Sequence, residues 1–141
     1  MNTLLDPGAR KVMQLATVEA QRLNSAMIGT GHILLALIAD AKGIFGGGTI
    51  QFDCDLDSVR REVSTLVEPA EHTVVGKVPL TRTAKMAIEH ALMLGNNEYV
   101  SRIHLLIGIL QTDDAVAVRV LAQFGLSSVD VVRDALATIA T

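Results

Sequence analysis

The strongest constraint on this chain is that it repeats itself. Residues 5–16 match residues 80–91 at a shift of 75 positions, and after a three-residue deletion in the second copy the shift becomes 72 and holds. That register aligns three polar features: His32 with His104, Gln51-Phe52 with Gln123-Phe124, and Arg61-Glu62 with Arg133-Asp134. Chance supplies apolar coincidences but not these pairs in one register, so the chain is an internal duplication. We expect one domain over 1–141, with repeat one at 5–67, a linker at 68–79 and repeat two at 80–141.

Each copy is predicted to begin with an amphipathic helix. Asp6 followed by Pro7 is typical of an N-cap and a first helical position, and Thr81 stands at the matching place in the second copy. Apolar residues then recur at helical spacing on one face of each helix. They are Ala9, Val12, Met13, Ala16, Ala20 and Leu23 in the first copy, and Ala84, Ala87, Ile88 and Ala91 in the second.

The next helix of each copy is apolar on all sides, which predicts a central, buried helix. These segments are Ile33–Ala39 and Leu105–Leu110, with Thr30 and Ser101 as the expected N-caps. His32 and His104 stand where these two helices begin. Each is either a ligand or base, or an imidazole that hydrogen-bonds the preceding turn. The second role is favoured, because no further ligand lies at metal-binding spacing.

The later helices are less regular. In the second copy, Asp113 or Asp114 is expected to start a third helix that runs to Phe124 and stops at Gly125. Ser127 or Ser128 then caps a fourth helix, with Val129, Val132, Ala135, Leu136 and Ile139 predicted to be buried. In the first copy, Asp55 or Asp57 caps the equivalent helix, which buries Val59, Val63, Leu66 and Val67. Three glycines at 46–48 predict an irregular loop instead of the third helix there, since each costs about 1 kcal/mol relative to alanine.

These elements predict an all-α fold of two tandem four-helix repeats packed with pseudo-twofold symmetry. With 15 acidic and 12 basic side chains and no basic block, the chain is a poor match for nucleic acid. Cys54 is the only cysteine, which precludes an internal disulfide and favours a reducing compartment. The first eight residues lack the features of a secretory signal. The longest apolar run has seven residues, far below the roughly 20 that span a bilayer, so we expect a soluble cytoplasmic protein without a membrane partner.

No catalytic, cofactor-binding or metal-binding constellation is predicted. Asp53–Asp57 opens like a calcium loop, but Ser58 and Ser64 stand where an EF-hand needs glycine and glutamate. The stretch Gly43–Thr49 is rich in glycine but lacks the lysine and the preceding strand of a phosphate-binding loop. We therefore expect that the protein is not an enzyme.

The duplicated pattern resembles the N-terminal domain of the ClpC/ClpA class of Hsp100 chaperones. In the first copy, the resemblance lies in A-R-K-V-x-x-L-A-x-x-E-A-x-R-L-N over 9–24 and I-G-T-x-H-I-L-L-A-L-I over 28–38. In the second copy, it lies in V-P-L-T-x-x-A-K over 78–85, Leu94-Gly95-Asn96, Tyr99-Val100 and the tail from Val116 to Gly125. The resemblance covers nearly the whole chain.

In that family the domain precedes two ATPase modules, recruits substrates and adaptor proteins, and passes substrates to a ClpP-type protease. Since no ATPase module follows within these 141 residues, the resemblance implies a stand-alone N-domain. The expected partners are a Clp ATPase, Clp protease subunits or protein clients. The family usually has glutamate before each motif histidine, and in some members these glutamates help to bind phosphoarginine. Gly31 and Ile103 stand there in this chain, which argues against that ligand.

The resemblance also implies a ligand site where the first helix of each copy begins. The expected residues are Leu5, Asp6, Leu80 and Thr81, with Arg82 and Lys85 as rim charges. The alternative is that Leu5 and Leu80 only staple their helices. The predicted function is a non-catalytic protein- or peptide-binding module of the Clp chaperone–protease system, with an adaptor, regulatory or substrate-recruiting role. The alternative function is sequestration of a small hydrophobic or cyclic-peptide ligand, as a decoy for the full chaperone.

Overall fold

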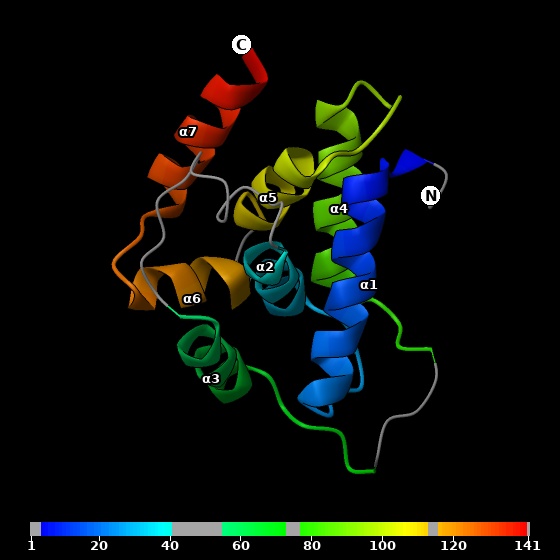
Figure 1. Ribbon diagram of the computed structural model, residues 1–141, viewed down its shortest axis with the longest axis vertical. Coiled ribbons are helices and arrows are strands. Elements are labelled where there is room, and N and C mark those ends of the chain that lie inside the picture. Colours follow the sequence, from blue (N-terminus) through cyan, green and yellow to red (C-terminus); the bar gives the residue numbers. More distant parts are fainter. Residues whose placement is uncertain (1–3, 41–54, 73–76, 113–115, 141) are drawn as a thin grey trace.

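The computed structural model describes residues 4–40, 55–72, 77–112 and 116–140, with side chains to 137. Every regular element in this part of the chain is a helix, which confirms the all-α prediction (Figure 1). The irregular loop predicted in place of a third helix in repeat one, with its three glycines, and Cys54 fall within 41–54, outside the described residues. The helices are α1 (Pro7–Arg22), α2 (Thr30–Ala39), α3 (Leu56–Leu66), α4 (Arg82–Leu94), α5 (Arg102–Leu110), α6 (Val116–Gln123) and α7 (Ser128–Ala140).

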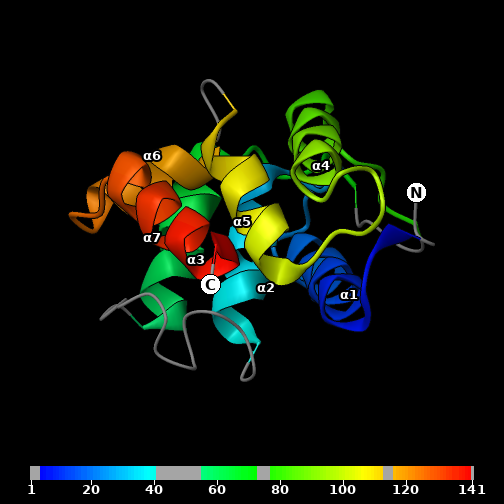
Figure 2. The ribbon, with the colours of Figure 1, turned by 90° about the horizontal axis from the view of Figure 1, so that it is seen from above.

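Helices α2 and α5 form the centre of the molecule, as their apolar sequences predict. Seen from above in Figure 2, α1 and α4 lie together on one side, and α3, α6 and α7 lie on the other. All residues from Thr30 to Leu37 and from His104 to Leu110 are buried. No helix in the described ranges is long and apolar enough to cross a membrane.

The outer helices α1 and α4 pack through small side chains. The predicted stripe is buried in both copies, with Met13 and Leu23 half-buried at its margin. Gly108 on α5 lies so close to α4 that an added Cβ would stand 2.3 Å from the Ala87 carbonyl oxygen. The three-residue deletion falls within this element, since α1 has 16 residues and α4 has 13.

Two isolated parallel bridges cross between the repeats. Leu5 of the first repeat pairs with Val100 of the second, and Leu80 of the second pairs with Ile28 of the first. The Asp6 N–H donates to the Val100 carbonyl at 2.9 Å, and the Thr81 N–H donates to the Ile28 carbonyl at the same distance. Each repeat therefore fixes the segment that leads into the other repeat's first helix, and the two halves interlock.

Most of the predicted helix ends are confirmed. Asp6, Asp55, Thr81 and Ser101 cap their helices by accepting backbone N–H groups. Gly125 ends the α6 segment with a φ of +78°, a left-handed conformation that glycine adopts at no steric cost.

The prediction for Thr30 is wrong, since the N-cap of α2 is Gly29. The ring of His32, the third residue of α2, accepts the Gly29 N–H at 2.9 Å, and the His32 N–H donates to the Gly29 carbonyl at 3.1 Å, so this turn is closed without a capping hydroxyl. The Thr30 hydroxyl instead accepts the Ala117 N–H at 3.2 Å and joins α2 to the first turn of α6.

The predicted buried stripe of α7 is partly wrong. Val132 and Ala135 are buried, but Val129 is 73% exposed and Leu136 is 42% exposed, while Val131 is buried instead. This edge helix packs against α5 and α6 on one side only, so its buried stripe is narrow. The Ile139 side chain lies outside the described residues.

Candidate functional site

A groove lies beside α1, next to the segments that lead into α1 and α4. We call this concavity, which has a volume of about 540 Å³, the α1 groove. One wall is the α1 face, and the other is the extended segment that leads into α4, at the right of Figure 1. Its apolar lining residues are Leu5, Met13, Ile28, Val78, Pro79 and Leu80, and its polar ones are Arg10, Gln14, Thr17 and Lys77.

The α1 groove carries positive charge only. Arg10 on α1 and Lys77 on the opposite wall are its two charged lining residues, and both are exposed. Neither side chain makes a hydrogen bond or an ion pair with another residue in the described ranges. An apolar floor between two cations that have no partner among the described residues is suited to an apolar ligand that also carries negative charge.

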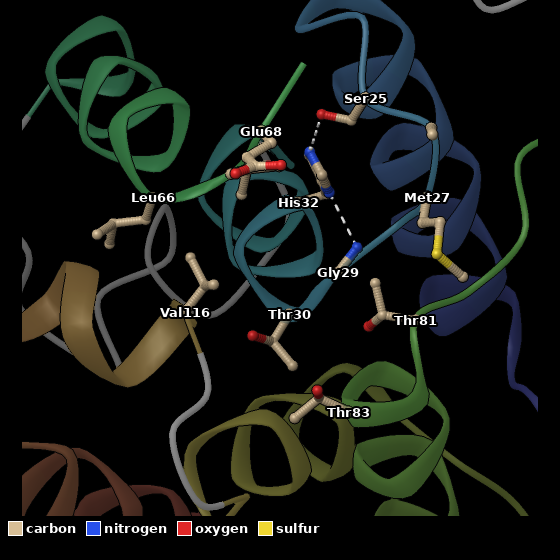
Figure 3. Close-up of a pocket in the computed structure, with 12 residues that line it drawn as sticks. Ser25, Met27, Gly29, Thr30, His32, Leu66, Glu68, Thr81, Thr83 and Val116 are labelled. Carbon is tan, nitrogen blue, oxygen red and sulfur yellow. Dashed lines mark hydrogen bonds between the residues drawn. The ribbon is translucent and has the colours of Figure 1, made fainter. Parts of the chain in front are cut away.

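A second concavity of about 350 Å³ lies where the N-termini of α2 and α4 approach each other. We call it the threonine pocket, because Figure 3 shows Thr30, Thr81 and Thr83 gathered there, with Glu68 near His32 on the other side. Its apolar lining residues are Ala26, Met27, Leu66, Val67 and Val116.

His32 is part of the structure around the threonine pocket. Its Nδ1 accepts the Gly29 N–H at 2.9 Å, which leaves the ring proton on Nε2, 3.1 Å from the Ser25 hydroxyl (Figure 3). Burial lowers the pKa of His32 to about 4, with nearby Glu19 opposing that shift. The imidazole is therefore neutral near pH 7 and holds the turn before α2 in place.

His104 plays the same part in the second repeat. Its Nδ1 accepts the Ser101 N–H at 3.0 Å, and the edge of its ring meets the Tyr99 ring, with centroids 5.3 Å apart. Burial lowers the pKa of His104 as well. The predicted role of both histidines, to hydrogen-bond the turn before the buried helix, is confirmed. Within the described ranges, no three metal-ligating side chains come together.

Gly31 stands where the family pattern has a glutamate before the first motif histidine, and it packs closely against α3 and α6. A Cβ added at Gly31 would stand 2.8 Å from Val116 Cγ1 and 3.1 Å from Val63 Cγ1. A longer acidic side chain at this position would displace the start of α6.

The equivalent of the threonine pocket in the other half is filled by Arg102, which occupies the register position of Thr30. Its Nε lies 2.6 Å from Asp40 Oδ2, and its guanidinium covers Gly8, the counterpart of Thr83. The Asp40 carboxylate is fully buried and also lies 3.6 Å from Lys11 Nζ. Sequence reasoning missed this cluster, because an aspartate after an apolar helix has the pattern of an exposed end.

The predicted site residues are divided among several places. Leu5 and Leu80 meet in the α1 groove, where Leu5 is buried and Leu80 is half-buried. Thr81 lines the threonine pocket, and Asp6 caps α1. Arg82 borders a shallow pocket with His90 and Gln111, and Lys85 is exposed on α4. The groove residues Arg10, Met13 and Lys77 were not predicted, although the stripe containing Met13 pointed to this helix face.

Known proteins show the same fold and sequence pattern. The sequence model of the Clp repeat (R) N-terminal domain matches residues 5–95, which is more than half of the chain. The chain belongs to this family. A probable ATP-dependent Clp protease ATP-binding subunit from Chlamydia pneumoniae is 36% identical over 137 residues, which are 94% of this chain and 16% of that protein. The chaperone protein ClpC1 of rice (Oryza sativa subsp. japonica) is 36% identical over 121 residues, 83% of this chain and 13% of that protein.

Solved structures agree with the fold of this Clp N-terminal domain. The N-terminal domain of the chaperone ClpD from Arabidopsis thaliana superposes with a TM-score of 0.78 at 23% identity, covering 99% of this chain and 96% of that one. The Hsp104 N-terminal domain from Candida albicans superposes with a TM-score of 0.68 at 16% identity, covering 94% of this chain and 89% of that one. The chain thus corresponds to a small part of its ATPase relatives and to nearly the full length of solved Clp N-terminal domains.

Proposed function

We propose that this Clp N-terminal domain is a non-catalytic binding module that receives protein or peptide ligands in a cytoplasmic Clp chaperone–protease system. The α1 groove is the observation that carries this proposal, because it offers an apolar floor to a ligand. The proposed partners are a Clp ATPase, Clp protease subunits or protein clients. The names of two relatives, an ATP-binding subunit of Clp protease and the chloroplastic chaperone ClpC1, support the link to the Clp system.

In this proposal, Leu5 and Leu80 act at different depths of the same site. Leu5 is buried in its bridge to Val100 and shapes the floor, whereas the half-buried Leu80 contacts the ligand. Asp6 and Thr81 act through the helix ends that they cap. Covering one apolar ligand side chain contributes about 1.5–3 kcal/mol, so micromolar binding, which needs about 8 kcal/mol, requires several contacts along the groove.

The test compares capture of Clp ATPase, protease and client proteins by the wild type, Leu80→Glu and Val129→Glu. Val129 is the matched control, since it is an exposed aliphatic residue on α7 at the opposite side of the molecule. We expect the wild type and Val129→Glu to retain these proteins and Leu80→Glu to lose them. Equal capture by all three folded proteins contradicts the groove assignment. Retention of a hydrophobic cyclic peptide without any Clp protein favours the decoy function instead.

A further inference from the structure

We propose that the ligand of the α1 groove is an extended protein segment in which an apolar side chain is flanked by carboxylates. This inference rests on the proposed function and adds the ligand's charge. The groove supplies one cation from each wall, Arg10 and Lys77, and no acidic residue of the described part of the chain lines it. A ligand segment of this kind would place its apolar side chain on the groove floor and its flanking carboxylates beside the two cations at the rim.

The two cations are available to a ligand. Two other basic side chains of the described chain form ion pairs with carboxylates: Arg60 binds Glu19, and Arg102 binds Asp40. Arg10 and Lys77 make no such contact with a described residue, although the protein carries a net charge of -3. The groove is a local positive site on an acidic protein, which favours encounter with acidic segments.

The duplication provides an internal comparison. In the repeat register, Arg10 and Gln14 on α1 correspond to Lys85 and Glu89 on α4. On α4 the carboxylate Glu89 follows Lys85 by one turn, whereas on α1 the corresponding residue is the uncharged Gln14. The carboxylate one turn before Arg10, Asp6, caps the helix. Met13, half-buried in the groove, corresponds to Ile88, which is 3% exposed and belongs to the core. The same helix position is thus used for packing in one repeat and borders an open, positive groove in the other.

The test uses three short synthetic peptides that share a central pair of leucines and carry glutamate, glutamine or lysine flanks. Binding to the full chain is measured by fluorescence anisotropy at low salt and again at about 0.5 M salt, where screening shortens the range of charge interactions to a few ångströms. We expect the acidic peptide to bind about five- to tenfold tighter than the neutral one, and the basic peptide to bind weakest. This difference is expected to shrink at high salt.

Two variants locate the effect. Arg10→Glu/Lys77→Glu is expected to reverse the order of the acidic and basic peptides, whereas Arg119→Glu, an exposed charge reversal on α6, leaves the order unchanged. Thermal unfolding verifies that both variants fold. Equal affinity for the three peptides, lost in Leu80→Glu, overturns the charge inference and leaves the proposed function standing. No binding of any peptide overturns both, and an acidic preference unaffected by the double variant overturns the assignment to this groove.

Discussion

The guanidinium of Arg102 reaches from the first residue of α5 to the buried carboxylate of Asp40 at the end of α2, with Nε and Oδ2 2.6 Å apart. The contact occupies the place that stays open as the threonine pocket in the other half. One repeat therefore uses this cleft as a structural joint, while the other leaves a cavity of about 350 Å³.

Replacing Arg102 with alanine is expected to lower the free energy of unfolding by about 2 kcal/mol, because it removes a 2.6 Å ion pair from a fully buried carboxylate. Urea unfolding at 25 °C measures the change. Arg133→Ala serves as the control, since its exposed pairs with Asp130 and Asp134 contribute at most about 1 kcal/mol. Equal effects of the two variants would show that burial of Asp40 does not matter.

Glycine at 108 is required by the approach of α5 to α4. Gly108→Ala places a Cβ 2.3 Å from the Ala87 carbonyl oxygen, so the helices must separate, and we expect a loss of about 3 kcal/mol. Gly125→Ala meets no atom within 4 Å and costs only the strain of its positive φ, about 1–2 kcal/mol. Thermal melts of both variants check the order, and a Gly108→Ala variant as stable as the wild type contradicts the packing described here.

The lowered pKa of His32 predicts that the free energy of unfolding falls at acidic pH. Its pKa is about 4 in the folded protein against an ordinary value of 6.5, so between these pH values the unfolded chain binds more protons than the folded one. Stability from this group is full above pH 6.5 and is lost as the pH falls towards 4, by roughly 3 kcal/mol. Urea unfolding of the wild type and His32→Asn across this range isolates the effect from the carboxylates. Parallel curves for the two proteins would contradict the prediction.

The hydroxyl of Thr30 is expected to stabilise the start of α6. Thr30→Val keeps the shape of the side chain but leaves the buried Ala117 N–H without its acceptor, at a cost of about 1–3 kcal/mol. Thr65→Val on α3 is the control, since Thr65 is exposed and bonds only within its own helix. Hydrogen exchange of the Ala117 amide provides a local readout, and unchanged protection in Thr30→Val would rule out this contact.

The helices could be predicted well because burial at 3.6-residue spacing and capping are local signals. Asp6, Thr81, Ser101 and Gly125 took the places their residue types favour. The stripe of α7 was predicted less well, since Val129 and Leu136 are apolar without being buried. Applying the repeat register would have corrected it, because Val59 and Val63 correspond to the buried Val131 and Ala135.

The candidate site was harder to predict, because it depends on segments far apart in the sequence. Leu5 and Leu80 were named from the family pattern, and the structure brings them to one groove. Lys77 has no periodic or motif signal, and its position opposite Arg10 follows only from the bridge between Ile28 and Leu80. Asp40 and Arg102 are 62 residues apart, so their contact required the packed helices.

The two bridges tie each repeat to the other. Leu5 finds its partner only in the second repeat, and Leu80 finds its partner only in the first. Cutting the chain in the linker would leave each fragment with an unpaired leading segment and an exposed central helix, so we expect neither fragment to fold alone. Two fragments mixed together, or two whole chains that exchange halves, satisfy every bridge again. On this view the two copies of the duplicated unit are expected to fold only together.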